Sequence, residues 1–390
     1  MRYLQILWWL SLACIAYAYL IYPVMMAVAA RLRPLRLPRT GTMPSSVSII
    51  LAAHNEAKTI AGRIRELLGL LDASGLSGEL IVVSDGSTDS TGATARSFSA
   101  APVRVIEMAE NMGKAVALTR ACAAARYPIL IFADARQHWH PQALVRLLAR
   151  FTDPAVGAVS GELIVESAPG VMAGVGLYWR YEKWLRRNEG RVHSTVGVTG
   201  AISAVRRELF RPIPPATLLD DLYWPLGVAM QGRRIVHEPT AIAYDRLPES
   251  PRDEFRRKVR TLSGNFQLLG RLPAGLLPWR NPIWFELLSH KVLRLLVPWA
   301  MLALFLLSAV IPGELYRAAF WTQIGFYGLA ICGLARSLSA RLRIASAASS
   351  LLVLNAAAWI AFWVWASGRA GRSWKKVVYE SEPAGQPAGT

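Results

Sequence analysis

Short apolar runs alternate with longer amphipathic stretches through the first half of the chain. The four runs lie at Val47–Ala53, Glu79–Ser84, Val103–Met108 and Ile129–Ala133. A continuous apolar run of this length predicts a strand that is buried on both faces, as in a parallel sheet covered by helices. Strands that alternate with helices at this spacing predict a doubly wound α/β fold.

Longer apolar runs lie on either side of this α/β region. Leu4–Ala30 is nearly free of charge and is long enough to cross a bilayer of roughly 30 Å, so we expect an uncleaved anchor. Arginines follow it directly, which by the positive-inside rule places the next domain in the cytosol, at the inner (plasma) membrane. Three further runs close the chain and make it multi-pass: Leu295–Ile311, Ala318–Leu334 and Ile344–Ala366.

The last three runs conflict with the charge rule if all of them cross. Three crossings would carry the basic residues after position 368 to the outer side. We therefore expect one run to be re-entrant or to lie in the interface, and the first two are the shorter ones. The net charge is +18 over 390 residues. Because the Lys and Arg residues cluster beside the apolar runs, we expect them to meet anionic lipid headgroups, not nucleic acid.

Polar residues follow the predicted strands where those strands end. Asn55 and Glu56 follow the first strand, Asp85 the second and Asp134 the fourth, while Lys114 begins a helix. Each residue alone fits a turn, a cap or a solvated helix face. Together they favour a nucleotide site, because parallel strands end at one edge of the sheet and a lysine at a helix start can meet phosphate. The sequence has neither the dinucleotide-binding nor the P-loop glycine motif.

Four segments resemble the successive signatures of inverting family 2 glycosyltransferases. They end in His54-Asn-Glu56, Asp85-Gly-Ser-Thr-Asp89, Asn111-Met-Gly-Lys114 and Phe132-Ala-Asp134. The similarity covers roughly residues 45–270 and is greatest in layout to the membrane-bound branch with cellulose, hyaluronan and poly-N-acetylglucosamine synthases. It implies a GT-A fold, a doubly wound mixed sheet with transmembrane helices at both ends of the chain. It also implies transfer of a sugar from a nucleotide-sugar, a UDP-sugar by expectation, to a lipid-linked or glycan hydroxyl.

The resemblance also implies roles for individual residues. Asp221 corresponds to the general base, with Asp220 as its acidic neighbour, and the acceptor is expected beside Gly200 and Trp224. A base is needed because the attacking hydroxyl loses its proton as the new bond forms. The residues expected at the nucleotide-sugar are Ala53, Asn55, Glu56, Asp85, Lys114, Asp134, Arg136, Arg257 and Arg260.

Two motifs depart from the family. The metal-binding Asp-x-Asp is Asp134-Ala-Arg136 here, so either Asp134 ligates Mg²⁺ or Mn²⁺ with help from phosphate and water, or Arg136 partly replaces the metal charge. The Gln-x-x-Arg-Trp motif is Arg257-Lys-Val-Arg260-Thr261, within a predicted amphipathic helix at Pro251–Gly270. These basic residues could instead serve only the lipid surface. The missing tryptophan argues against processive synthesis.

The predicted organisation follows from these patterns. The ranges are 1–30 (anchor), 31–44 (basic linker), 45–250 (cytosolic GT-A domain), 251–294 (interfacial helices), 295–368 (transmembrane helices) and 369–390 (tail). The expected partners are the donor, the acceptor, membrane lipids and a membrane subunit. Two alternatives stay open: a processive polysaccharide synthase subunit of the cell envelope, and a catalytically silent nucleotide-sugar-binding scaffold.

Overall fold

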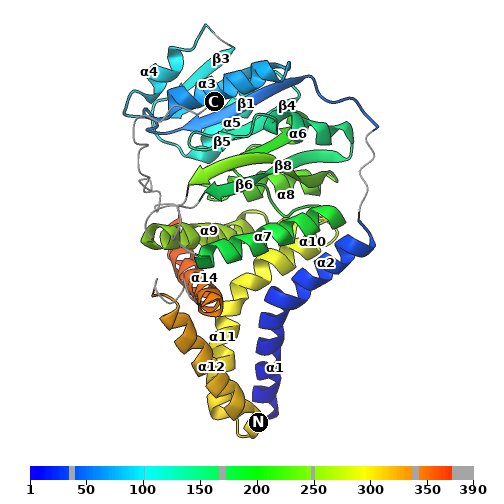
Figure 1. Ribbon diagram of the computed structural model, residues 1–390, viewed down its shortest axis with the longest axis vertical. Coiled ribbons are helices and arrows are strands. Elements are labelled where there is room, and N and C mark those ends of the chain that lie inside the picture. Colours follow the sequence, from blue (N-terminus) through cyan, green and yellow to red (C-terminus); the bar gives the residue numbers. More distant parts are fainter. Residues whose placement is uncertain (35–39, 101, 167–172, 247–250, 336–341, 371–390) are drawn as a thin grey trace.

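The computed structural model describes residues 1–34, 40–100, 102–166, 173–246, 251–335 and 342–370. A layered α/β domain stands above a narrow stem of helices, and further helices lie between the two (Figure 1). Residues 35–39 of the expected basic linker and residues 371–390 of the expected tail lie outside the described residues.

An eight-stranded sheet forms the centre of the α/β domain. Its strands are β1 (Ser46–Ala53), β2 (Ser77–Asp85), β3 (Val103–Met108), β4 (Ile129–Asp134), β5 (His138–Trp139), β6 (Val156–Glu166), β7 (Ile202–Arg206) and β8 (Arg234–Arg246). Their order is β3-β2-β1-β4-β7-β6-β8-β5. The first four strands are parallel to one another, whereas β7 runs antiparallel to both β4 and β6. The predicted fold class is confirmed, and the antiparallel pairings of β7 and of β5, which pairs with β8, make the sheet mixed.

Helices cover both faces of the sheet. They include α3 (Ile60–Ala73) on one face, and α5 (Lys114–Ala124) and α8 (Asp220–Met230) on the other. Along β1, Ile49 and Leu51 belong to the core under α3 and Ile50 to the core under α5, and all three are fully buried. Alternate residues of a strand face opposite sides of a sheet. Burial on both sides therefore explains why the strand is apolar throughout.

The smaller elements connect these layers. They are α4 (Thr91–Arg96), α6 (Ala143–Leu148), η2 (Ala149–Thr152), η3 (Arg207–Leu209) and η4 (Pro273–Leu276). The carboxyl ends of β1, β2 and β4 lie at a common edge, since these strands are parallel neighbours. The polar residues that follow those strands are thereby brought together.

A layer of helices separates the sheet from the stem (Figure 1). It contains α7 (Ala173–Val192), α9 (Pro251–Arg271) and α10 (Trp284–Leu287). The helix predicted at 251–270 is thus present as α9, and its apolar stripe packs on α14 (Arg343–Ala366). Phe266 stacks on Trp365 with ring centroids 5.7 Å apart, and Ser263 donates a hydrogen bond to the carbonyl of Ala361 at 3.1 Å. The stripe is covered by the chain itself.

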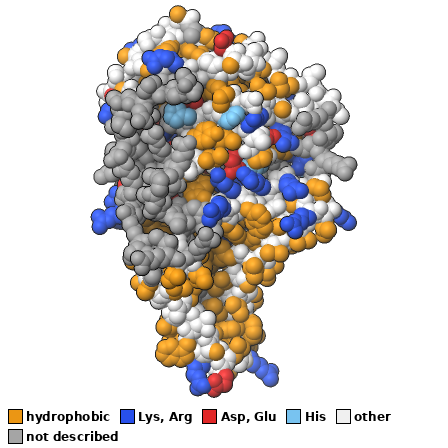
Figure 2. Space-filling view, in the orientation of Figure 1, with side chains coloured by type: hydrophobic (Ala, Val, Ile, Leu, Met, Phe, Trp, Pro, Cys, Tyr) orange, Lys and Arg blue, Asp and Glu red, His pale blue; other side chains and the backbone are white. Residues whose placement is uncertain are grey.

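The stem is built from helices of both ends of the chain. They are α1 (Arg2–Ala16), η1 (Tyr17–Ile21), α2 (Tyr22–Leu32), η5 (Leu288–Val292), α11 (Leu293–Val310) and α12 (Glu314–Cys332). Within the described part of the chain, three helical stretches are long and apolar enough to span a membrane: Arg2–Leu32, Trp284–Val310 and Ile344–Ala366. The Trp8 indole N–H donates to the Ser308 hydroxyl at 2.8 Å and joins α1 to α11. Figure 2 shows hydrophobic side chains over much of the stem surface in this view.

The run predicted at Ala318–Leu334 lies mostly in α12, which is not among these three stretches. It packs along α11, where the rings of Phe305 and Phe320 stack at 5.2 Å. The run predicted from Leu295 belongs to a longer helical stretch that begins at Trp284.

Candidate active site

The carboxylate at the end of β2 holds the loop that leads into α5. Asp85 is buried, and its two oxygens accept hydrogen bonds from the backbone N–H groups of Met112, at 2.8 Å, and Gly113, at 2.9 Å. Gly113 has a φ of +90°, a conformation that favours glycine. Asp85 therefore fixes where α5 begins, and with it the position of Lys114. Asp85 thus positions Lys114 through the backbone. The contact with the nucleoside predicted for Asp85 is a separate role.

The loops after β1 and β2 are tied to each other. Asn55 has a φ of +54°, and its side-chain oxygen accepts a hydrogen bond from the Thr88 N–H at 2.8 Å. The N–H of Glu56 donates to the Thr91 hydroxyl at 2.8 Å, and Ala53, the last residue of β1, is buried. Residues around position 55 and residues 85–91 thus form one rigid rim at the edge of the sheet.

Lys114 lies between the carboxylates of two other elements. Its ammonium donates to Asp134 at 2.7 Å and lies 3.7 Å from an oxygen of Asp220. Burial alone would lower the pKa of this ammonium, but Asp134 and Asp220 outweigh burial and hold the pKa above its ordinary value. Lys114 is therefore cationic at neutral pH, at the start of α5 where backbone N–H groups also point outward.

Gly200 lies where the side chains of three elements converge. A Cβ added there would be 3.6 Å from the Lys114 nitrogen, 3.8 Å from an oxygen of Asp221 and 3.9 Å from an oxygen of Asp134. These groups come from α5, α8 and β4, far apart along the chain. The missing side chain leaves a space that a cation and two carboxylates border. Four of the residues predicted at the site are thus brought together.

Asp221 has the electrostatic surroundings of a base. It lies in the first turn of α8, and its carbonyl accepts a hydrogen bond from the Val198 N–H at 2.9 Å. Burial and the neighbouring charge of Asp220 raise the pKa of its carboxyl to about 6, although Lys114 acts in the opposite direction. At neutral pH Asp221 is still mostly ionised, and it binds a proton more readily than an ordinary aspartate.

Other residues predicted at the site have different surroundings. The Arg136 guanidinium binds Asp245 through two hydrogen bonds of 3.1 and 2.9 Å, so a bidentate contact with phosphate would compete with this pair. Arg257 pairs with Glu254 on its own helix at 2.7 Å. The prediction that Trp224 lines the acceptor is wrong. Its ring is buried in the core, 5.2 Å from that of Phe132, because it points from α8 toward the sheet.

A small cavity of about 80 Å³ extends from Asp221 toward the stem. Asn265 lines it, and its buried side-chain oxygen has no hydrogen-bond partner among the described residues. His290 and Lys291 also line it, and His290 is held by Glu189 at 2.7 Å. Sequence reasoning assigned no role to these residues in the site. One pattern in the sequence could have indicated His290 and Lys291: both are ionisable residues in a helix that continues into an apolar run. Ionisable residues at such places often mark functional positions in membrane proteins.

The described residues supply only part of the ligand set that a divalent cation needs. The described residues contain no group of three or more His, Cys, Asp or Glu side chains placed for a metal ion. Asp134 offers one oxygen beside Gly200, while its other oxygen is bound by Lys114. Mg²⁺ and Mn²⁺ often take few protein ligands and complete their shell with substrate phosphate and water. Asp134 therefore fits a cation that arrives with a diphosphate.

Comparison with known proteins gives a consistent result. Residues 48–213 match the model of glycosyl transferase family 2. The poly-β-1,6-N-acetyl-D-glucosamine synthase of Staphylococcus aureus is 23% identical over 238 residues, which are 58% of this chain and 56% of that protein. The succinoglycan biosynthesis protein ExoU of Rhizobium meliloti is 34% identical over 113 residues, covering 28% of this chain and 32% of its own length. The chain thus spans about half the length of the synthases it matches.

A solved structure shows the same fold. It is the mannosyltransferase PcManGT from Pyrobaculum calidifontis in complex with GDP-Man and Mn²⁺. The TM-score is 0.64 with 21% sequence identity, and the match covers 90% of this chain and 99% of that one. The GT-A type of mixed sheet is therefore shared, together with the helices that accompany it.

Proposed function

We propose that this chain, which carries a glycosyltransferase family 2 domain of GT-A fold, transfers a sugar from a nucleotide-sugar to a hydroxyl acceptor at a membrane surface. The observation that carries the proposal is the convergence at Gly200. There Lys114, Asp134 and Asp221 border one space, each with an atom less than 4 Å from the same point. A cation for the leaving group and a base for the attacking group are what a single displacement requires.

The bond changes assign a task to each side of this space. The acceptor oxygen attacks the anomeric carbon as the bond from that carbon to the diphosphate oxygen breaks. Asp221 takes the proton of the acceptor hydroxyl, and its pKa of about 6 leaves it ionised and able to do so at pH 7. Attack from the side opposite the leaving group inverts the configuration at the anomeric carbon.

Lys114 and Asp134 serve the leaving diphosphate. The cationic Lys114 lies at the start of α5, so its charge and the helix N–H groups favour phosphate there. A bound Mg²⁺ or Mn²⁺, held by Asp134, would neutralise charge on the diphosphate. The mannosyltransferase of the same fold was solved with GDP-Man and Mn²⁺, and a UDP-sugar is the donor we propose for this chain.

The arrangement of helices supports a membrane-facing acceptor. Asp221 opens toward a cavity lined by Thr261 of α9 and by His290 and Lys291 at the top of the stem. We propose a lipid-linked or glycan acceptor that approaches from this side. If the three qualifying stretches cross, the chain after Ala366 lies on the side of the catalytic domain. By the positive-inside rule, Arg31 and Arg33 at the end of Arg2–Leu32 favour the cytosol for that domain.

One alternative function has a specific observation in its favour. The similarity to poly-N-acetylglucosamine synthases makes processive synthesis the second candidate. Thr261 stands where the family motif has a tryptophan that would stack on an acceptor sugar, so we favour single transfer. Product length with the purified chain separates the two: a single added sugar supports our proposal, and a ladder of products contradicts it.

The proposed activity is tested by a donor screen. The purified full-length chain is incubated with lipid extract and with UDP-, GDP- and other nucleotide-sugars, and nucleoside diphosphate release is measured with and without Mn²⁺. We expect acceptor-dependent release with one class of donor. Binding of a nucleotide-sugar without turnover under every condition would instead indicate a silent scaffold.

A further inference from the structure

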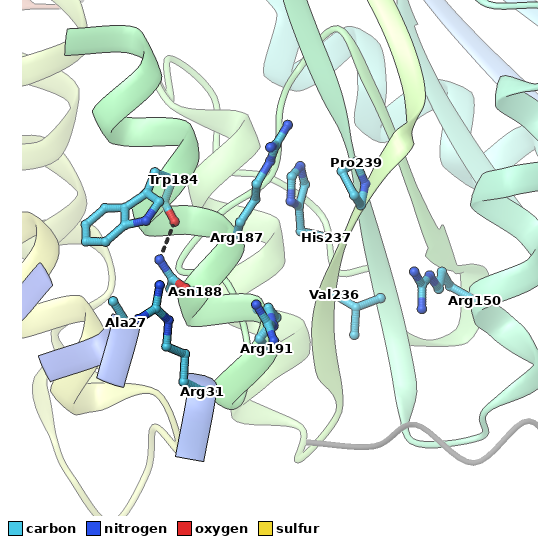
Figure 3. A pocket seen from close by; sticks show the side chains of 11 residues that line it. Ala27, Arg31, Arg150, Trp184, Arg187, Asn188, Arg191, Val236, His237 and Pro239 are labelled. Atoms are coloured by element: carbon cyan, nitrogen blue, oxygen red, sulfur yellow. Dashed lines mark hydrogen bonds between the residues drawn. The ribbon is translucent and has the colours of Figure 1, made fainter. Parts of the chain in front are cut away.

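A second and larger cavity lies between the membrane helix α2, the interfacial helix α7 and strand β8 (Figure 3). Its volume is about 480 Å³, and four arginines line it: Arg31, Arg150, Arg187 and Arg191. His237 and Trp184 also contribute to the lining, and no Asp or Glu is among the described lining residues. The cavity is therefore strongly basic.

Two of the four guanidinium groups have acidic partners behind the cavity wall. The Arg187 side chain lies 3.5 Å from Glu162, and Arg150 pairs with Glu238. Arg31 and Arg191 are exposed and have no acidic partner within the described ranges. The cavity thus keeps positive charge that the protein itself does not neutralise.

The cavity lies at the C-terminal end of the first candidate membrane span, Arg2–Leu32. Arg31 is in the last turn of the helical stretch Arg2–Leu32, and Ala27, one turn earlier, forms part of the wall. Val24 and Val28 on the same helix are about half exposed, as is Trp184 across the cavity. Apolar side chains on one side and guanidinium groups on the other are typical of the depth of lipid headgroups.

This cavity is separate from the proposed active site. Arg186 and Glu189 of α7 line the small cavity beside Asp221, whereas Arg187 and Arg191 line the basic one. At 3.6 residues per turn these two pairs point to opposite faces of the helix. A ligand in the basic cavity would therefore not occupy the space in which transfer occurs.

We propose that the basic cavity binds the phosphate-bearing headgroup of an anionic membrane phospholipid. Guanidinium groups bind phosphate in a bidentate manner, and juxtamembrane basic residues are attracted to anionic lipid. The apolar wall next to α2 matches acyl chains, which a nucleic acid or an acidic protein lacks. Such a lipid would join the anchor to α7 and β8 and fix the orientation of the catalytic domain on the membrane.

The test is lipid retention by the full-length chain in a neutral detergent. The protein is titrated with phosphatidylglycerol or phosphatidylcholine, and bound lipid is counted by native mass spectrometry. We expect one phosphatidylglycerol to be retained in preference to phosphatidylcholine. The double variant Arg31→Gln/Arg191→Gln, which removes no ion pair of the described residues, should bind phosphatidylglycerol roughly 10- to 30-fold more weakly.

The matched control is Arg33→Gln/Arg126→Gln, which removes two exposed arginines, one of them also beside the membrane helix. This control should bind like the wild type, and Arg191→Lys should bind more tightly than the double variant but less tightly than the wild type, because it keeps the charge and loses the bidentate contact. Equal retention of the two lipids by the wild type would overturn the proposal even if the double variant does not fold. Displacement of phosphatidylglycerol by micromolar inorganic phosphate would overturn the lipid assignment, because the site would then be one for free phosphate.

Discussion

Replacing Gly200 by alanine tests whether the space beside it is where the reaction occurs. The new methyl group would lie 3.6 to 3.9 Å from Lys114, Asp221 and Asp134, which is ordinary van der Waals contact. The fold can therefore accept it, and the free energy of unfolding should change by less than about 1 kcal/mol. The methyl group would nevertheless occupy the space between base and cation that the sugar has to enter.

The expected effect is on catalysis alone. A displacement of reacting groups by about 1 Å can reduce a rate roughly 100-fold, so we expect Gly200→Ala to lower kcat/KM by about that factor. The assay is sugar transfer by purified protein, with the apparent Tm in detergent measured in parallel. The matched control is Gly62→Ala on α3, where an added methyl group meets nothing within 4 Å. If Gly200→Ala and Gly62→Ala transfer sugar equally fast, the space beside Gly200 is not the reaction site.

Three further predictions concern the charges around that space. Because Asp221 must be ionised to accept a proton and has a pKa of about 6, kcat/KM should fall about tenfold per pH unit below pH 6 and level off above it. Lys114→Met should weaken donor binding about 10- to 100-fold, because it removes a charged hydrogen-bond donor from the phosphate site, and Lys114→Arg should restore part of it in a donor titration. Arg136→Ala should destabilise the fold by about 1–3 kcal/mol, because it removes an ion-pair partner of the buried Asp245 carboxylate. The apparent Tm should therefore fall, while the rate of transfer per folded molecule persists.

Each of these predictions has a result that contradicts it. A rate that does not change between pH 5 and pH 7 would exclude Asp221 as the titrating base, provided that chemistry limits the rate. An unchanged donor affinity in Lys114→Met would remove the phosphate role of that residue. A complete loss of transfer in folded Arg136→Ala would return Arg136 to the donor site, as the sequence alone suggested.

The parallel half of the sheet and the gathering of acidic residues were predictable from local signals. Four apolar runs specify β1 to β4, and parallel strands bring Asp85 and Asp134 to one edge whatever the details of packing. Asp221 and Gly200 were found through the family resemblance, since a short acidic pair and a glycine carry little information alone. Asp221 and Gly200 lie close together because of how α8 and the loop before β7 pack. The hydrophobic pattern of the sequence does not predict that packing.

The parts that were missed depend on partners distant in sequence. Arg136 and Asp245 are 109 residues apart, so no local pattern indicated that the guanidinium would bind a carboxylate of β8. Trp224 was assigned through the family resemblance, but its ring packs in the core against Phe132, a contact between residues 92 positions apart that the sequence does not show. The stretch Trp284–Val310 was predicted to begin later because His290 and other ionisable residues interrupt its apolar pattern. Glu189 of α7 binds His290 and makes its burial possible.

The most direct test of the account is a comparison of Asp221→Asn with the wild type at pH 7. The substitution keeps the size of the side chain and removes its ability to accept a proton in the reaction. Donor binding, measured by titration with the nucleotide-sugar that the screen identifies, should be nearly unchanged. Sugar transfer to the acceptor should fall about 100- to 10,000-fold. Transfer at the wild-type rate by the folded variant would contradict the assignment of Asp221 as the base and, with it, the mechanism proposed for this site.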